Sequence, residues 1–412
     1  MVFLYGLGIR LYLLLVWLVS PFNSKASLWL NGRKRWSERL RKAIDNNEPI
    51  AWFHCASLGE FEQGRPLIEA YKEKYPDHKI LITFFSPSGY EVRKNYSGAD
   101  YVFYLPIDTR HNAKRFVSIV NPVVAVFIKY EFWHYILNEL KHKNIPTYLV
   151  SAIFRQGQIF FRWYGFWNRR MLHCFSHIFV QNDISKQLLN SLNLFNVDVT
   201  GDTRFDRVYA TAKSSEKLPL LDEFCQDYPV IVAGSTWPKD EELLISFIKK
   251  TNHRVKLIIA PHEIVENRIK SIIESIGMST IRFSKPDIRL VKDSKVLIID
   301  TMGILSSTYR YGHIAYVGGG FGAGIHNTLE PATFGLPILF GPHYQKFREA
   351  KELIELKAAF SITDENELIS KLTYLLNHKD QLVNAGATSS KYVEKNIGAT
   401  QKVLAMITPK PQ

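Results

Sequence analysis

The sequence predicts an α/β protein built from two successive parallel-sheet domains. The chain has 412 residues, which is too long for one ordinary core and fits two domains of about 150 to 200 residues each. Short apolar runs alternate with helix-like stretches, as in parallel strands that helices cover on both faces. Because this alternation occurs as two series separated by a polar tract, we expect two Rossmann-like domains that face a central cleft.

The amino-terminal end reads as a membrane-associated segment, which we place at residues 1–45. Residues 1–22 contain one charged side chain, Arg10, and the uninterrupted apolar run 11–19. That run is about half the ~20 residues that a bilayer span requires, so an interfacial anchor and a full span both stay open. The basic, tryptophan-containing stretch that follows suits anionic lipid headgroups and places the next domain on the cytoplasmic side. The alternatives are that the apolar leader is a signal peptide, or that the basic stretch is a solvated helix.

The composition narrows the class of partner. A formal net charge of +13 and a pI near 9.4 indicate nucleic acid, a membrane surface or a phosphorylated substrate. No nucleic-acid motif accompanies the charge, so we expect no nucleic-acid partner. The three cysteines have no CxxC spacing, which argues against a disulfide framework or a zinc site and favours a reducing compartment.

The first domain is expected over residues 46–208. Its predicted strands are 50–54, 80–84, 101–104, 123–128, 147–150 and 177–180. After the first strand, a helix beginning beyond Ser57 puts Glu60 at the carboxyl edge of the sheet, where ligands bind in open α/β folds. Glu60 could be a general base, or it could close a capping box with Ser57, and the spacing fits both.

Two further charged residues have the same position at the sheet edge. Glu131 follows the fourth strand, and we expect it in the first turn of a helix, where the helix dipole alone would favour a carboxylate. Arg204 ends the first series and could neutralise an anion that develops in a reaction. A local ion pair with Asp202 or Asp206 is the simpler account of Arg204.

A linker is expected at 209–222 and the second domain at 223–412. Its predicted strands are 230–233, 255–260, 296–299, 313–317 and 337–340. Ser235 and Thr236 follow the first of these strands, where their hydroxyls could cap a helix and seat a phosphate. The turns at 261–262 and 300–303 and a glycine-rich turn end other strands. Four turns at one sheet edge predict a ligand pocket.

The glycine-rich run 316–342 is the strongest binding signal in the chain. It lacks the GxGxxG spacing and lies late in its domain, so the dinucleotide fingerprint does not apply, and a mononucleotide sugar donor fits better. Backbone amides near Gly324 could hold phosphate, and Glu330 could accept hydrogen bonds from ribose hydroxyls.

Taken together, the motifs resemble one enzyme family. The motifs in chain order are ASLGEFEQGRPLI, SPSG, PID, YEFWH, GDTRFD, AGSTWPKDEELL, DTMGIL and GIHNTLEPATFGLPILFGPH. This set resembles the 3-deoxy-D-manno-octulosonic acid (Kdo) transferases of lipid A biosynthesis. The resemblance implies a GT-B glycosyltransferase that needs no metal or cofactor and is attached to the cytoplasmic face of the inner membrane. It also implies inverting transfer of Kdo from CMP-Kdo to a lipid A precursor.

The resemblance assigns roles to individual residues. It makes Glu60 the general base and Glu131 and Arg204 the stabilisers of the transition state. The CMP contacts that it implies fall on Pro261, His262, Met302, Gly303, Ile304, Asn327, Thr328, Leu329 and Glu330. The sequence departs from the family pattern in four places: the usual S-T-H reads Ser235-Thr236-Trp237, P-R-H reads Pro261-His262-Glu263, M-G-E reads Met302-Gly303-Ile304, and the usual Lys is Arg204. These departures affect cytidine recognition more than the reaction class.

Two other functions fit the same residues. One is a GT-B transferase with a UDP-sugar donor, which nucleotide competition would reveal. The other is a membrane-anchored protein that binds lipid A or a nucleotide without catalysis, for which Glu60→Gln would leave function intact.

Overall fold

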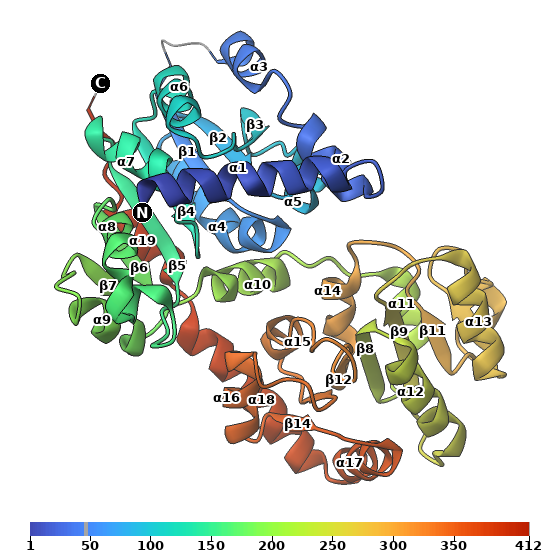
Figure 1. The fold of residues 1–412 in the computed structure, drawn as a ribbon. Coiled ribbons are helices and arrows are strands. Elements are labelled where there is room, and N and C mark those ends of the chain that lie inside the picture. The colour runs from blue at the N-terminus through green and yellow to red at the C-terminus, as the bar shows by residue number, and fades with distance from the viewer. Residues whose placement is uncertain (45–47, 412) are drawn as a thin grey trace. The chain divides into compact units, whose positions relative to one another are not determined.

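The computed structural model describes residues 1–44 and 48–411, and Figure 1 shows the order of the elements. The chain forms two compact units, Met1–Arg207 with Ile397–Gln412, and Val208–Asn396. Each unit contains one seven-stranded sheet. All strand pairs in both sheets are parallel. The predicted pair of parallel-sheet α/β domains is therefore confirmed.

The first sheet has the order β3-β2-β1-β4-β5-β6-β7. Its strands are β1 (Ile50–Cys55), β2 (Lys79–Phe84), β3 (Tyr101–Tyr104), β4 (Val124–Ile128), β5 (Thr147–Ala152), β6 (His177–Val180) and β7 (Val197–Val199). The strand order reverses between β1 and β4, because β2 lies on one side of β1 and β4 on the other. Open α/β sheets bind ligands at the carboxyl ends of the strands beside such a reversal.

Helices cover both faces of this sheet. They are α3 (Trp36–Ala43), α4 (Leu58–Lys74), α5 (Pro87–Arg93), α6 (Arg110–Val120), α7 (His134–His142), α8 (Phe166–Leu172), α9 (Asp183–Asn190) and α19 (Ala399–Met406). Helix α10 (Thr203–Lys213) begins in this unit and continues beyond Arg207, where the unit ends. Successive β1 side chains point to opposite faces. Trp52 therefore packs with Phe116 of α6, whereas Phe53 packs in the cluster that contains Phe61 of α4 and Val403 of α19.

The second sheet has the order β10-β11-β9-β8-β12-β13-β14, with its reversal between β8 and β12. Its strands are β8 (Val230–Thr236), β9 (Lys256–Pro261), β10 (Thr280–Arg282), β11 (Val296–Ile298), β12 (Ile314–Val317), β13 (Ile338–Phe340) and β14 (Ala359–Ser361). The helices of this unit are α11 (Pro219–Cys225), α12 (Pro238–Lys250), α13 (Glu266–Ile276), α14 (Leu305–Thr308), α15 (Leu329–Thr333), α16 (Arg348–Glu355), α17 (Glu365–Asn377) and α18 (Lys379–Asn396).

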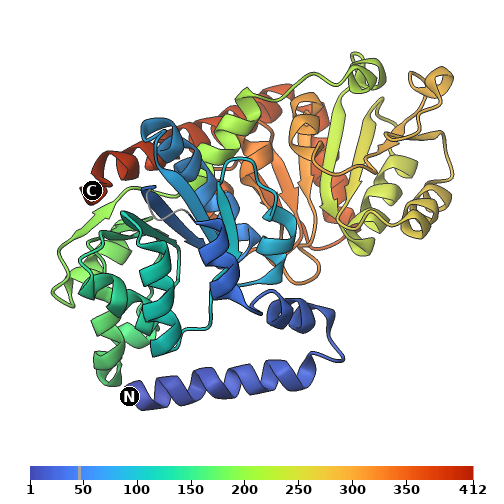
Figure 2. The ribbon, with the colours of Figure 1, turned by 90° about the horizontal axis from the view of Figure 1, so that it is seen from above.

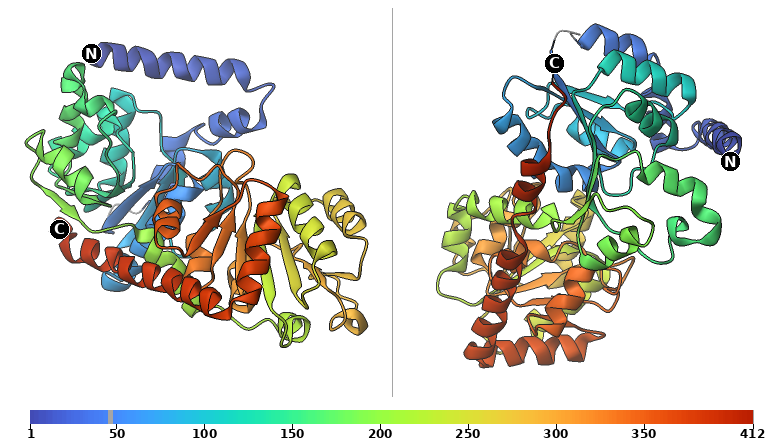
Figure 3. Two further views of the ribbon diagram at one scale, coloured as in Figure 1. Left: turned by 90° about the horizontal axis from the view of Figure 1, so that it is seen from below. Right: turned by 90° about the vertical axis from the view of Figure 1, so that its left-hand side faces the viewer.

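The C-terminal segment departs from the predicted domain extents. The sequence predicts residues 397–412 in the second domain, but the described part, 397–411, packs on the first unit, as Figure 3 shows. Asp206 accepts hydrogen bonds from the backbone N–H groups of Gly398 and Thr400, at 2.5 and 2.7 Å, and Val403 and Leu404 join the core beside α4. Much of the predicted linker 209–222 is helical, in α10 and α11. The predicted boundary at 45/46 lies outside the described residues.

Helix α1 (Val2–Val19) forms the start of the first unit and is followed by α2 (Ser24–Asn31). It is a straight helix at the margin of its unit, visible in Figure 2. Its length and apolar composition suffice to cross a membrane, and none of its residues is buried. Two tyrosines attach it to the unit: the Tyr5 hydroxyl donates to Asp108 at 2.6 Å, and the Tyr12 ring packs edge-on against Trp29.

Candidate active site

Glu60 lies in the first turn of α4, beyond the carboxyl end of β1, as predicted. Ser57 is the N-cap residue of α4, but its side chain accepts no helix N–H group. The Ser57 hydroxyl instead donates to the Glu60 carboxylate. The capping-box interpretation is therefore wrong, because the bond joins the two side chains and leaves the backbone uncapped. Glu60 is half-buried, so its carboxylate is oriented by Ser57 and still reachable.

Glu131 does not lie in a helical turn, contrary to the prediction. Helix α7 begins at His134, and its first N–H groups donate to Asp108: Tyr135 N at 3.0 Å and Ile136 N at 2.9 Å. A helix dipole therefore does not explain Glu131. Its carboxylate accepts from the indole N–H of Trp133 at 2.8 Å and lies 3.1 Å from Nε2 of His54, with 12% of the side chain exposed.

Arg204 lies in the first turn of α10 and makes the predicted ion pair with Asp202. Its Nε donates to Asp202 Oδ2 at 2.8 Å. The other oxygen of Asp202 accepts from Gln63 Nε2, at 2.7 Å, and Gln63 lies one helical turn beyond Glu60 on α4. The Arg204 side chain is still 38% exposed. The ion pair thus fixes the guanidinium near the helix that carries Glu60 without burying it.

These three residues share one edge of the sheet, because Glu60 and Glu131 follow the paired strands β1 and β4, and Asp202 joins Arg204 to Gln63 of α4. Burial raises the pKa of the Cys55 thiol, and the carboxylates of Glu60 and Glu131 raise it further. Burial also raises the pKa of the Tyr130 hydroxyl, with smaller electrostatic contributions that include lowering by Arg204 and raising by Glu60. The structure therefore brings the predicted catalytic residues together within the first unit.

At the carboxyl edge of the second sheet, the predicted hydroxyl cap is absent. Ser235 and Thr236 are the last two residues of β8, and the N-cap of α12 is Trp237. The Thr236 hydroxyl is buried and donates to Glu241 at 2.8 Å, so it points into the protein. Ser235 has φ +54°, a left-handed conformation that is uncommon for serine and that occurs preferentially at ligand sites.

Asp240, which the sequence analysis missed, joins the turn after β8 to the glycine-rich loop. One carboxylate oxygen accepts from the backbone N–H groups of Trp237 and Gly319, both at 2.9 Å, and the other accepts from the Tyr316 hydroxyl at 2.7 Å. The side chain is buried. From the sequence, an acidic residue shortly after Pro238 reads only as an ordinary first-turn carboxylate.

Three aromatic rings meet above β8, β9 and the glycine-rich loop. The indole N–H of Trp237 donates to His326 Nε2 at 3.0 Å. The His262 ring stacks on both partners, with centroid distances of 4.8 Å to Trp237 and 4.4 Å to His326. Burial lowers the pKa of His326, and His262 lowers it further. The departures at Trp237 and His262 therefore form one cluster, which includes a residue that sequence reasoning did not select.

The other residues predicted to contact the nucleotide differ in the exposure of their side chains. The side chains of Pro261, Thr328 and Leu329 are buried, so only their backbone can contact a ligand. Asn327 is exposed, and its amide donates to Glu330 at 2.9 Å.

The loop after β11 and the glycine run complete this edge. Met302 is 84% exposed, Gly303 has φ +89°, and Ile304 is half-buried. Gly324 has φ +138°, and a side chain there would also press against Phe347. Glycine is therefore required at 324 to form this turn.

No group of three or more His, Cys, Asp or Glu side chains in the described part of the chain could hold a metal ion. Independence from metals and cofactors stays a prediction.

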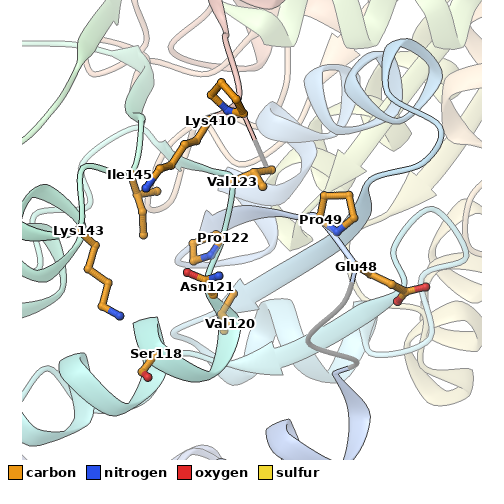
Figure 4. A pocket seen from close by; sticks show the side chains of 11 residues that line it. Glu48, Pro49, Ser118, Val120, Asn121, Pro122, Val123, Lys143, Ile145 and Lys410 are labelled. Carbon is orange, nitrogen blue, oxygen red and sulfur yellow. The ribbon is translucent and has the colours of Figure 1, made fainter.

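A separate cavity of about 710 Å³ lies at the opposite edge of the first sheet (Figure 4). Its lining includes Pro49, Val123 and Ile145, which precede β1, β4 and β5. Lys410 also lines it, and its backbone N–H donates to Val123 O at 2.8 Å. Because parallel sheets bind substrates at the carboxyl ends of their strands, we assign this cavity no part in the active site.

Comparisons with known proteins agree on one family. The sequence model of a family described as "3-Deoxy-D-manno-octulosonic-acid transferase (kdotransferase)" matches residues 34–207. A 3-deoxy-D-manno-octulosonic acid transferase of Rickettsia felis is 30% identical, over 87% of this chain and 79% of the relative. Another, of Aquifex aeolicus, is 29% identical, over 83% of this chain and 90% of the relative.

Solved structures support the fold. The structure of UDP-GlcNAc 2-epimerase from Neisseria meningitidis, bound to UDP-GlcNAc, has a TM-score of 0.58 and 16% identity, and the match covers 84% of this chain and 99% of that one. At this identity the likeness shows the fold alone, and it spans both units, as the GT-B class requires. The chain belongs to the 3-deoxy-D-manno-octulosonic acid transferase family and is a glycosyltransferase.

Proposed function

We propose that this enzyme transfers Kdo from CMP-Kdo to a lipid A precursor with inversion at the anomeric carbon. Family membership supports the reaction class. The observation that carries the chemistry is the Glu60 carboxylate, oriented by Ser57 at the point where the first sheet reverses its strand order. A half-buried carboxylate with one fixed oxygen is suited to accept a proton from an acceptor hydroxyl.

The reaction is a direct displacement. Glu60 takes the proton of the acceptor hydroxyl as the oxygen attacks the anomeric carbon of Kdo. The bond from that carbon to the phosphate oxygen of CMP breaks, and CMP leaves with the electron pair. The proton then passes from Glu60 to solvent. Attack from the face opposite the leaving phosphate inverts the anomeric configuration.

Glu131 and Arg204 stabilise charge in the transition state. Positive charge develops at the anomeric centre as the CMP bond breaks, and the Glu131 carboxylate, held by Trp133, favours it. Arg204 supplies a cation for the anionic groups of the reactants, such as the Kdo carboxylate or the departing phosphate. Its pair with Asp202 sets the direction of the guanidinium, and arginine can bind a carboxylate through two parallel hydrogen bonds.

The second unit binds the nucleotide. We assign the phosphate to the left-handed turn at Ser235 and the glycine loop, which is held by the hydrogen bond from the Gly319 N–H to Asp240. Asn327 and Glu330 offer polar groups for the ribose or the base. The rings of Trp237 and His262 stand where the usual family pattern has His and Arg, so donor contacts there rest on stacking as well as hydrogen bonds.

Helix α1 attaches the enzyme to the cytoplasmic leaflet of the inner membrane. Tyr5 and Tyr12 are two helical turns apart on one face, and both contact the first unit. The rest of its surface exposes Leu4, Leu7, Leu11, Leu14, Leu15 and Leu18. Because the helix is held along its own unit, we place it in the plane of the leaflet and not across the bilayer.

Charge beside this helix supports contact with anionic lipid. Arg10 of α1 and Arg110, His111 and Lys114 of α6 line a cavity of about 510 Å³. Cationic side chains next to an apolar face favour a surface of negatively charged headgroups.

Product analysis tests the proposed reaction. The purified full chain is incubated in detergent with CMP-Kdo and a lipid A precursor, and the product is identified by mass spectrometry and the anomeric configuration by NMR. We expect a mass increase of one or more Kdo residues, stoichiometric release of CMP and an inverted linkage. UDP-sugars serve as competing donors. Transfer from a UDP-sugar, or no transfer from CMP-Kdo, would refute the proposal.

A further inference from the structure

A histidine lies buried in an interior strand of the first sheet, next to Glu131. His54 belongs to β1, is fully buried, and is the register neighbour of Thr83 on β2 and Phe127 on β4. Its ring packs edge-on against Phe127, with a centroid distance of 5.7 Å. An apolar side chain would fit a strand of this kind without needing polar partners. Both ring nitrogens of His54 have polar partners, so this side chain forms hydrogen bonds in addition to packing.

The hydrogen bonds around His54 have a defined direction. Indole N–H groups only donate, so Trp52 Nε1 donates to Thr83 Oγ1, at 2.8 Å. Thr83 Oγ1 then has its own hydrogen free to donate to His54 Nδ1, at 2.9 Å. On the other side of the ring, Nε2 lies 3.1 Å from Glu131 Oε2. An ionised carboxylate accepts only, so the ring nitrogen that faces it carries a hydrogen.

The result is a chain of donors that ends on one carboxylate oxygen. Trp52 donates to Thr83, Thr83 to His54, and His54 to Glu131. Trp133 donates to the same Glu131 oxygen, and its Nε1 lies beside the His54 ring, 3.2 Å from Nε2. Glu131 lies between β4 and α7 and belongs to neither element, so no helix turn or strand ladder fixes it. Its orientation depends on these two side-chain donors.

We propose that His54 is a positioning residue that holds the Glu131 carboxylate in its working orientation, with Thr83 fixing the ring tautomer. This rests on the role given to Glu131 in the proposed function. Thr83 sets the tautomer because Nδ1 also lies 3.1 Å from the backbone oxygen of Thr83, which would otherwise attract the ring hydrogen to Nδ1. The hydroxyl keeps that hydrogen on Nε2, toward Glu131.

Two substitutions at His54 separate positioning from packing. A glutamine amide nitrogen reaches about as far as Nε2, so His54→Gln retains a donor to Glu131. An asparagine amide ends near the position of Nδ1, so His54→Asn retains the Thr83 side and loses the donor to Glu131. Both variants replace a buried ring by a smaller amide. If His54 had only a packing role, both variants would therefore lose activity to the same extent.

The assay measures kcat and KM for Kdo transfer with the full chain. We expect His54→Asn to lower kcat about 10- to 100-fold with little change in KM, as when the outer partner of a functional side chain is removed, and His54→Gln to recover most of that loss. Glu131→Gln should lower kcat at least as much as His54→Asn. Thr83→Val, which leaves the His54 ring in place, should lower kcat less than His54→Asn and leave KM unchanged.

The outcomes distinguish this inference from the proposed function. Equal activity of His54→Asn and His54→Gln, or a change confined to KM, would overturn the positioning role. Full activity of His54→Asn beside an inactive Glu131→Gln would overturn it while leaving the role of Glu131 intact. A fully active Glu131→Gln would overturn both assignments. If His54→Asn does not fold, Thr83→Val decides the matter, because unchanged kcat in that variant contradicts the proposed tautomer.

Discussion

Asp240 offers a sharp test of how the second unit builds its nucleotide site. Its carboxylate accepts hydrogen bonds from the Trp237 and Gly319 N–H groups and the Tyr316 hydroxyl, all with the side chain buried. Asp240→Ala leaves three donors without a partner, and the two buried ones, Gly319 N–H and the Tyr316 hydroxyl, cost about 1 to 3 kcal/mol each, so we expect at least about 2 kcal/mol of lost stability. Asp240→Asn keeps one acceptor oxygen and should lose about 1 to 3 kcal/mol.

The assay is urea unfolding followed by calorimetric titration with CMP. Because Asp240 fixes the glycine loop through Gly319, Asp240→Asn should also weaken CMP binding, by about tenfold, or about 1.4 kcal/mol. Glu242→Gln is the matched control, since this neighbouring acid on the same helix is exposed and pairs only with Lys239 among the described residues. An Asp240→Ala variant as stable as that control would refute the reasoning. Normal CMP affinity in a destabilised Asp240 variant would show that the conformation of the glycine loop does not determine nucleotide binding.

Three further predictions concern other parts of the chain. Burial and the neighbouring His262 lower the pKa of His326 in the folded protein, so the unfolded chain binds more protons below about pH 6.5. Acidification to about pH 5.5 should therefore destabilise the second unit, and His326→Phe should flatten this pH dependence in thermal melts. Asp206→Ala should lower the stability of the first unit by about 2 to 4 kcal/mol in urea, because buried Thr400 and the Gly398 N–H lose their acceptor; an unchanged midpoint would contradict the docking of the C-terminal segment. Leu14→Arg on the exposed face of α1 should reduce co-flotation with anionic vesicles, whereas Lys292→Gln in the second unit should not.

The central strands of both sheets were predictable from the sequence, and three edge strands were not. β1, β4, β8 and β9 are almost entirely buried and mostly apolar, which is the pattern that predicts a parallel strand. The missed strands, β7, β10 and β14, each have three residues and include polar ones, and each lies at the margin of its sheet. A short run that packs on one side only has little periodicity to detect.

The site was predictable where one turn carries the signal, as at Glu60. The residues that sequence reasoning missed, His54, Asp240 and His326, act through partners far away in the chain, such as His54 through Glu131 and Asp240 through Gly319. The spacing of residues along the sequence does not reveal contacts between such distant pairs. The capping-box interpretation of Ser57 failed for a related reason: the spacing is correct for a cap, but the hydroxyl donates to a side chain instead of accepting from the backbone.

The most direct test of the account is the rate of Kdo transfer by Glu60→Gln. Glutamine keeps the shape of the side chain and can still accept a hydrogen bond from Ser57, but it cannot take a proton. We expect CMP release and product formation to fall about 10²- to 10⁴-fold, with CMP binding unchanged. Glu69→Gln, an exposed acid on the same helix paired with Arg65, is the control and should retain full activity. Transfer by Glu60→Gln at the rate of that control would contradict the central claim that Glu60 is the general base.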